Sequence, residues 1–231
     1  MIDLAGFGQQ LLLGAAMTLQ LAVAALVVGM VLGLLGAVGR LSTFAPARAA
    51  AGAYTTIVRG LPELLVVLII YFGSSRLLSI VAAAFGHDGF VELSPFAAGV
   101  IALGLTFGAY ATEVFRGAIL AIPKGQIEAA HAYGMGRWLT FRRIVLPQLW
   151  RIALPGLGNL FLVLLKDTSL VSVIGLEELM RKSQIAVGFT REPFTFYLSA
   201  AALYLLMTII AMAALHRGER AAARGMPRPG G

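Results

Sequence analysis

Long apolar runs separated by short polar stretches make up most of this chain. Three runs contain no charged side chain and are each long enough to cross a bilayer: residues 9–38, 93–112 and 193–215. Two further runs are less uniform, because residues 54–75 include Arg59 and Glu63 and the run at residues 147–165 is short. The pattern predicts an all-α, polytopic membrane bundle with five transmembrane helices.

The Lys and Arg residues predict how this bundle is oriented. Most of them fall in three segments: residues 40–59, 116–151 and 217–228. Segments rich in Lys and Arg remain on the cytoplasmic side, and five crossings put the two termini on opposite sides. We therefore expect the N-terminus outside and the C-terminus inside, with a flexible cytoplasmic tail at residues 216–231 that lacks apolar periodicity.

Composition narrows the possible functions. The chain is 59% hydrophobic and 13% charged, and its mean hydropathy is +0.87, which is typical of a membrane protein. The net charge of +7 comes from basic residues beside apolar runs, so we expect contact with membrane lipid and not with nucleic acid. The chain has no cysteine and no GxxxxGK[ST] phosphate-binding loop. We expect it to bind no metal or cofactor and to hydrolyse no ATP by itself.

Two local patterns predict packing. Glycines recur at helical spacing in the first run, at Gly29, Gly33 and Gly36, and in the run at residues 93–112. Small residues at this spacing favour close approach of helix backbones. Glu113 and Arg116 lie three residues apart near a helix end and are expected to form an ion pair.

The most informative polar stretch is the loop at residues 128–147, EAAHAYGMGRWLTFRRIVLP. Its alanines favour a short helix and its glycines interrupt one, so we expect two brief helical pieces joined at Gly134, with Pro147 ending the second piece. On the predicted orientation the loop faces the cytoplasm. We interpret it as a docking surface, whose defining residues are Glu128, Ala129, Ala130, Gly134, Ile144 and Pro147.

A second polar group interrupts an apolar run. Fourteen residues without charge, 152–165, end at Lys166 and Asp167, which Thr168 and Ser169 follow. If the next segment turns back into the bundle, these four side chains lie at a helix break that lines a cavity, where ionisable groups are usually functional. Alternatively they lie at the outer water interface.

Glu63 lies at the predicted start of the second membrane helix, after Pro62. Its carboxylate complements the dipole of the helix N-terminus, or alternatively attracts a cationic solute. A guanidinium solute needs carboxylates and aromatic faces. The candidates for these contacts are Asp167, Glu63, Tyr71, Phe107 and Tyr110.

The loop identifies a family. Its spacing, EAA, three residues, Gly, nine residues and Ile-x-Leu-Pro, resembles the EAA loop of ABC-importer permeases. The chain resembles the polar amino-acid permeases of this group from about residue 11 to 215, and most of all the arginine permease that pairs with a second permease. Four further segments carry the resemblance: RGLPELLVVLIIYFG (59–73), LPGLGN (154–159), LLKDTSLVSVIGLEEL (164–179) and EPF (192–194).

The resemblance implies a type I importer permease in the bacterial inner membrane. Its implied partners are two copies of an ATP-binding subunit, a second permease that is identical or a sister chain, and a periplasmic amino-acid-binding protein. ATP and Mg would be used by the ATPase and not by this chain. The EAA residues would form the coupling helix, and the implied solute is a basic amino acid: arginine, or histidine, lysine and ornithine.

Three alternatives remain open at this point, and one of them is a non-transporting membrane scaffold for a signalling ATPase. The solute could be an opine or another polar amino acid, because permeases for these solutes are similar. A gradient-driven carrier that needs no ATPase is a different class of protein. Such carriers often consist of two inverted halves, whereas five predicted spans do not divide evenly and no internal repeat is visible.

Overall fold

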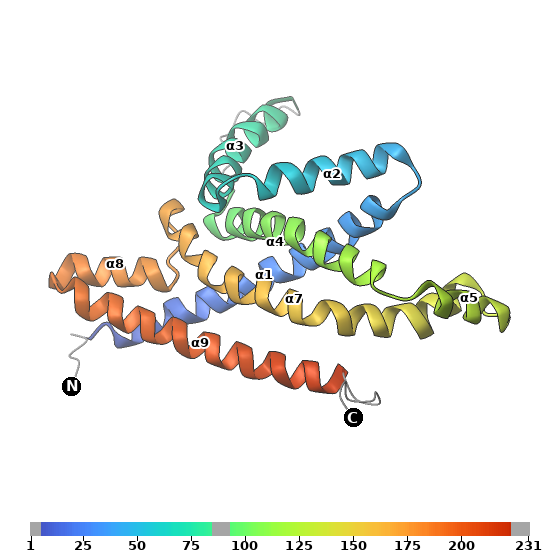
Figure 1. The fold of residues 1–231 in the computed structure, drawn as a ribbon. Coiled ribbons are helices and arrows are strands. Elements are labelled where there is room, and N and C mark those ends of the chain that lie inside the picture. The colour runs from blue at the N-terminus through green and yellow to red at the C-terminus, as the bar shows by residue number, and fades with distance from the viewer. Residues whose placement is uncertain (1–5, 85–92, 223–231) are drawn as a thin grey trace.

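The fold is an elongated helical bundle (Figure 1). The computed structural model describes residues 6–84 and 93–222. In these ranges the elements are helices throughout, as the sequence predicts. In chain order they are α1 (Gly8–Leu41), α2 (Ala45–Arg59), α3 (Glu63–Ala84), α4 (Pro95–Leu120), α5 (Lys124–Ala132), α6 (Arg137–Thr140), the π-helix η1 (Phe141–Val145), α7 (Leu146–Asp167), the 3₁₀ helix η2 (Thr168–Ile174), α8 (Leu179–Thr190) and α9 (Pro193–Ala222).

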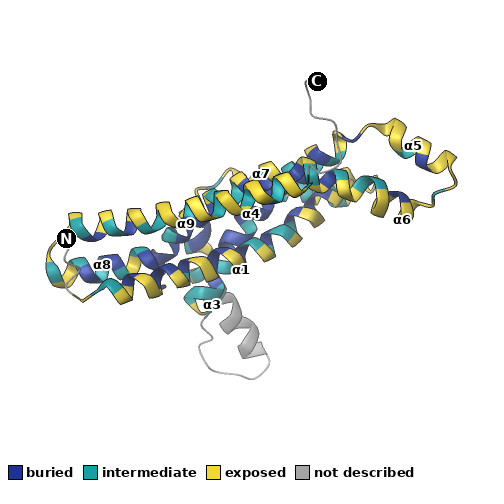
Figure 2. Ribbon diagram, turned by 90° about the horizontal axis from the view of Figure 1, so that it is seen from below, coloured by how far each residue is buried: buried dark blue, intermediate teal, exposed yellow. Residues whose placement is uncertain are grey.

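Four apolar segments are long enough to span a membrane: α1, α4, the continuous stretch Arg137–Ile174, and α9. A fifth span results if α2 and α3 count together, but these helices meet at an angle of 108°. In Figures 1 and 2, α1 begins and α9 ends at opposite ends of the bundle, which agrees with an odd number of crossings. The described helices thus offer four candidate spans, or the predicted five if the bent pair α2 and α3 crosses as one.

The apolar run at residues 54–75 is divided between two helices, and the second begins at Glu63, as predicted. Helix α2 ends at Arg59 and α3 begins at Glu63. Pro62 has no backbone N–H to donate, and it disfavours the helical conformation of the residue before it, so the apolar run breaks between Gly60 and Pro62. The break turns α3 away from α2 and leaves Glu63 in the first turn of a new helix.

Helix α1 packs along α4 through the predicted glycines. A Cβ built on Gly33 would lie 2.6 Å from the Cβ of Ala111, and one built on Gly108 would lie 2.8 Å from the Cβ of Leu32. Both separations are too short for real side chains, so only glycine allows the two backbones to come this close. The packing role expected for these glycines is confirmed.

The C-terminal helix is longer than predicted. Helix α9 continues to Ala222, so residues 216–222 of the expected tail are helical. The physical reason is that this stretch, HRGERAA, contains good helix formers and one glycine but no proline. His216 also contacts the carbonyl oxygen of Met212, one turn earlier, through Nδ1 at 2.8 Å. Residues 223–231 of the predicted tail lie outside the described residues.

Buried side chains form two clusters along the bundle. Exposed positions lie on its outer faces (Figure 2), and many of them are large apolar residues. The larger cluster joins α1, α3, α4, α7 and η2, and the smaller joins α1, α8 and α9 with the end of α7. The exposed faces of α1 and α9 carry residues such as Val27, Leu35, Leu205 and Ile210. Apolar surfaces of this kind suit contact with lipid tails.

Candidate functional site

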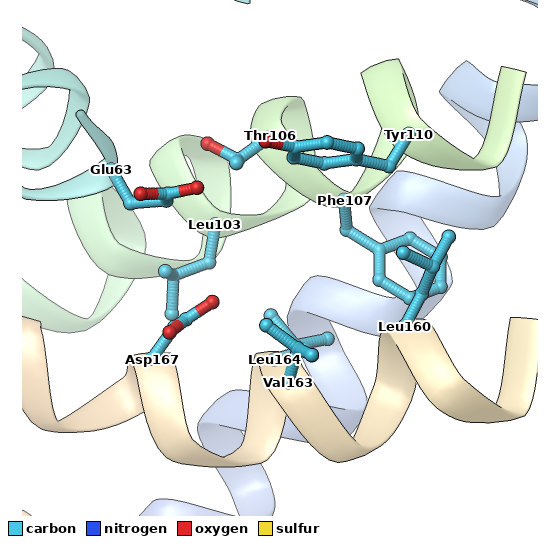
Figure 3. A pocket seen from close by; sticks show the side chains of 9 residues that line it. All are labelled: Glu63, Leu103, Thr106, Phe107, Tyr110, Leu160, Val163, Leu164 and Asp167. Atoms are coloured by element: carbon cyan, nitrogen blue, oxygen red, sulfur yellow. The ribbon is translucent and has the colours of Figure 1, made fainter. Parts of the chain in front are cut away.

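A cavity of about 180 Å³ lies between α3, α4 and α7. Its two acidic residues, Glu63 and Asp167, come from distant parts of the chain, and in Figure 3 both carboxylates point into the same space. Helix α4 supplies Thr106 and two aromatic rings, Phe107 and Tyr110. The remaining lining residues are apolar: Leu103, Leu160, Val163 and Leu164. We call this space the carboxylate cavity.

Local structure explains how the acids reach this cavity. Glu63 occupies the first turn of α3, where its charge complements the helix dipole. Because its carboxylate also lines the cavity, it can stabilise the helix and attract a cationic solute at the same time. Asp167 is the last residue of α7, at the point where the α-helix tightens into the 3₁₀ helix η2. The left-handed Gly175, with φ 92°, then ends η2.

The residues beside Asp167 are oriented differently. Lys166 is exposed, and Thr168 is fully buried with its hydroxyl donating to the carbonyl of Leu165 at 2.7 Å. The hydroxyl of Ser169 donates to the carbonyl of Lys166 at 2.7 Å. Of the four polar residues singled out at this helix break, Asp167 is the one that lines the carboxylate cavity.

A second polar cavity, of about 480 Å³, also has Tyr110 in its lining. Its lining comes from α1, α2, the turn that follows α2, and α4: Arg40, Thr55, Thr56, Arg59, Gly60, Tyr110 and Glu113. We call it the arginine cavity. Glu113 forms the predicted ion pair with Arg116, at 2.7 Å, and a longer one with Arg40, at 3.5 Å. The guanidinium of Arg59 lies 5.2 Å from the centre of the Tyr110 ring, within the range of a cation–π contact.

The EAA loop extends beyond one end of the bundle (Figure 2). As predicted, two helical pieces meet at a glycine turn, since α5 ends at Ala132 and Gly134 has φ 78°. Glu128 and Ala129 are exposed, whereas Ala130 is 5% exposed and faces the rest of the loop.

The expectation that Pro147 ends the second piece is wrong. The helical path runs through α6 and η1 into α7, and Pro147 lies in the first turn of α7. The π-helix η1 comes just before it, and Ile144 lies within η1. Where the backbone widens into a π-helix, the hydrogen-bond pattern shifts, so the missing N–H of a proline can be accommodated.

Several features of the loop were not predicted. Gln148 of α7 donates through Nε2 to Oε1 of Gln126 in α5 at 2.6 Å, which ties the loop to the membrane helix. Tyr133 is 88% exposed and Trp138 is 72% exposed. Exposed aromatic side chains of this size are typical of protein interfaces, and their position in the loop could have signalled this.

A fully buried acid, Glu178, was also missed. It precedes α8, and its two carboxylate oxygens accept hydrogen bonds from the backbone N–H groups of Met180 and Arg181, both at 2.9 Å. The hydroxyl of Tyr204 in α9 donates to Oε2 at 3.1 Å, and Thr18 of α1 lies 3.5 Å from the same oxygen. Burial raises the pKa of Glu178 above the ordinary glutamate value, and these hydrogen bonds oppose the shift.

A bundle of membrane-spanning helices that encloses a polar cavity, with a helical loop projecting from one end, defines a membrane transport subunit. The chain belongs to the family described as "Binding-protein-dependent transport system inner membrane component", which matches residues 25–222. It is therefore an inner-membrane permease that works with a separate ATPase and a binding protein, and it is not itself an enzyme.

Individual relatives are similar over almost the whole chain. The octopine transport system permease OccQ of Agrobacterium tumefaciens (strain Ach5) is 51% identical over 96% of this chain and 94% of its own length. The arginine ABC transporter permease ArtQ of Escherichia coli (strain K12) is 47% identical over 93% of this chain and 95% of its own. A crystal structure of an amino acid ABC transporter with histidines aligns with a TM-score of 0.79 and 34% identity, covering 94% of this chain and 95% of that one.

Proposed function

We propose that this chain forms the translocation path for a basic amino acid, arginine in the first place, in an ATP-driven importer. The observation that carries the proposal is the convergence of Glu63 and Asp167 on one cavity beside Tyr110 (Figure 3). Two carboxylates offer charge-assisted acceptors to a guanidinium or ammonium group, and an aromatic face adds a cation–π contact. The similarity to an arginine permease supports this solute class.

An opine is the second candidate, because the octopine permease is similar to this chain to a comparable degree. Octopine is an arginine derivative and keeps the guanidinium group. The carboxylate cavity therefore suits both solutes at their cationic ends. Direct comparison of arginine, histidine, lysine and octopine uptake distinguishes them.

The assembly we propose has two permease subunits, identical or sister chains, above two copies of the ATPase. The permease holds no cofactor, and the ATPase uses ATP and Mg. The exposed surface of α5, with Glu128 and Ala129, supplies the contact with the ATPase, and Gly134 sets the angle of the loop. Ile144 and Pro147 join this loop to α7. The exposed Tyr133 and Trp138 extend the same surface.

The test is uptake of labelled arginine into vesicles that contain the whole importer, with ATP enclosed on the side of the ATPase. We expect Asp167→Asn and Glu63→Gln each to lower arginine uptake about tenfold or more, because each removes one charged acceptor. Glu177→Gln is the matched control, since Glu177 is an exposed acid outside both cavities. Unchanged uptake by both cavity variants, at equal amounts of assembled importer, would overturn the proposal.

A further inference from the structure

The carboxylate cavity and the arginine cavity share one wall, the side chain of Tyr110. Thr106, Tyr110 and Glu113 follow each other on α4 at spacings of four and three residues, so they lie along one side of the helix. Seven residues of α-helix correspond to about 10 Å. The two cavities therefore lie on either hand of a shared lining residue, with Glu63 and Asp167 in one and Arg40 and Arg59 in the other, and the stretch of α4 that lines them is roughly as long as an extended amino acid with a long side chain.

The arginine cavity has more guanidinium groups than carboxylates. Its one acid, Glu113, is already engaged by Arg116. Glu113 also forms the longer ion pair with Nε of Arg40, which makes no hydrogen bond to any described residue. Among the side chains that the structure describes, no carboxylate lies within ion-pair distance of Arg59. The cavity therefore offers the guanidinium of Arg59 to an anionic group.

Arg59 is held in position from two sides. Its guanidinium stacks on the Tyr110 ring, which orients the planar group. One turn earlier in α2, the hydroxyl of Tyr54 donates to the carbonyl of Leu105 in α4 at 2.7 Å. This hydrogen bond ties α2 to α4 and fixes the distance between Arg59 and the shared wall.

We propose that Arg59, oriented by Tyr110, binds the α-carboxylate of the solute while the cationic end lies between Glu63 and Asp167. This inference rests on the proposed function and adds to it the orientation of the solute along α4. A planar guanidinium suits a carboxylate because it donates two parallel hydrogen bonds. The alternative for Arg59 is an interaction with the last carbonyls of α2, which does not depend on the solute.

The test compares arginine with agmatine, its decarboxylated form, which keeps the guanidinium. Equilibrium binding of each is measured on the purified permease and ATPase complex without the binding protein, so that only the permease discriminates. We expect the wild-type complex to bind arginine at least about tenfold more tightly than agmatine. Arg59→Gln weakens arginine binding about tenfold and leaves agmatine unchanged. Arg59→Lys retains part of the preference, and Tyr110→Phe, which keeps the ring, retains it.

Two results would overturn the inference and leave the proposed function intact: equal affinity of the wild-type complex for arginine and agmatine, or an unchanged preference in Arg59→Gln. If Arg59→Gln fails to assemble, the wild-type comparison together with Arg59→Lys decides. A wild-type complex that binds neither ligand, nor histidine, lysine or octopine, would refute the proposed function itself, and this inference with it.

Discussion

Replacing Glu178 by alanine is expected to release α8 from α1 and α9. The carboxylate caps the N-terminus of α8 through two backbone N–H groups and accepts a hydrogen bond from Tyr204. Thr18 contributes from α1, because its hydroxyl oxygen also accepts the backbone N–H of Leu179 at 3.2 Å. One side chain thus connects three helices.

The cost can be worked out from these contacts. Loss of an N-cap costs about 1 kcal/mol. A buried hydroxyl left without its acceptor, here that of Tyr204, costs about 1–3 kcal/mol. Part of this sum is offset, because a buried carboxylate is itself costly. After this offset we expect the free energy for local opening of α8 to fall by about 2 kcal/mol. An opening constant rises tenfold for every 1.4 kcal/mol or so, which gives an increase on the order of thirtyfold.

The chain suits a direct assay because it contains no cysteine. A single cysteine at Ala186, which is fully buried on α8, reports opening through its rate of reaction with a maleimide. Glu177→Ala is the matched control, since its side chain is 60% exposed and pairs with Lys182 at the surface. Such a pair is worth less than about 1 kcal/mol, so this control should change the labelling rate by less than about fivefold.

Tyr204→Phe tests the same reasoning in a second way. It removes the hydroxyl that Glu178→Ala leaves unpaired, so the double variant should open less readily than the sum of the two single effects predicts. Equal labelling rates in Glu178→Ala and Glu177→Ala, or strictly additive effects of Glu178→Ala and Tyr204→Phe, would show that the carboxylate does not fasten α8.

Three more predictions concern other parts of the molecule. Gly33→Ala should lower the free energy of unfolding by about 1–3 kcal/mol, because the new Cβ would overlap Ala111. Gly117→Ala is the control, since a Cβ there meets no atom within 4 Å, and thermal unfolding of the two variants makes the comparison. Glu128→Lys and Gly134→Asp should each abolish ATP-driven uptake at normal assembly, because they place charge or bulk on the loop, and wild-type uptake would contradict its docking role. Burial raises the folded-state pKa of Glu178 above its unfolded value, so the folded chain binds the proton more tightly. Stability is therefore expected to fall as pH rises through the interval between the unfolded and folded pKa values, and Glu178→Gln should remove that slope from a pH series of thermal unfolding.

The pattern of residues along the chain predicted three features that depend on local sequence: the membrane spans, the close packing at glycines and the glycine turn of the EAA loop. Apolar length gave the spans because the bilayer sets a minimum number of residues. The glycines of α1 predicted close packing because small residues at helical spacing have one common use in membranes, and Gly33 meets Ala111 of α4 as expected. The glycine turn of the EAA loop was also predictable, since Gly134 needs a positive φ that other residues adopt at a cost.

The local pattern could not predict which residues from distant parts of the chain come together in the folded structure. Glu177 and Glu178 are adjacent and identical in type, yet one is exposed and the other fully buried. The difference arises from Thr18 and Tyr204, which local sequence cannot bring to the same place. The arginine cavity was missed for a similar reason, because Arg59 appeared only as a basic residue at the edge of an apolar run.

The continuity of the helix from Arg137 to Ile174 joins the two ends of the proposed mechanism. Its first turns belong to the EAA loop, which Gln126 and Gln148 tie to α7, and Asp167 near its far end lines the carboxylate cavity. A hydrogen-bonded helix moves largely as one body, so a displacement of the loop reaches Asp167 unless the helix bends on the way. The π-helix η1 is a position where such bending is expected, because its hydrogen bonds are out of register with those of α7. We therefore expect η1, which contains Ile144 and comes just before Pro147, to set how much of a displacement of the loop is transmitted to Asp167.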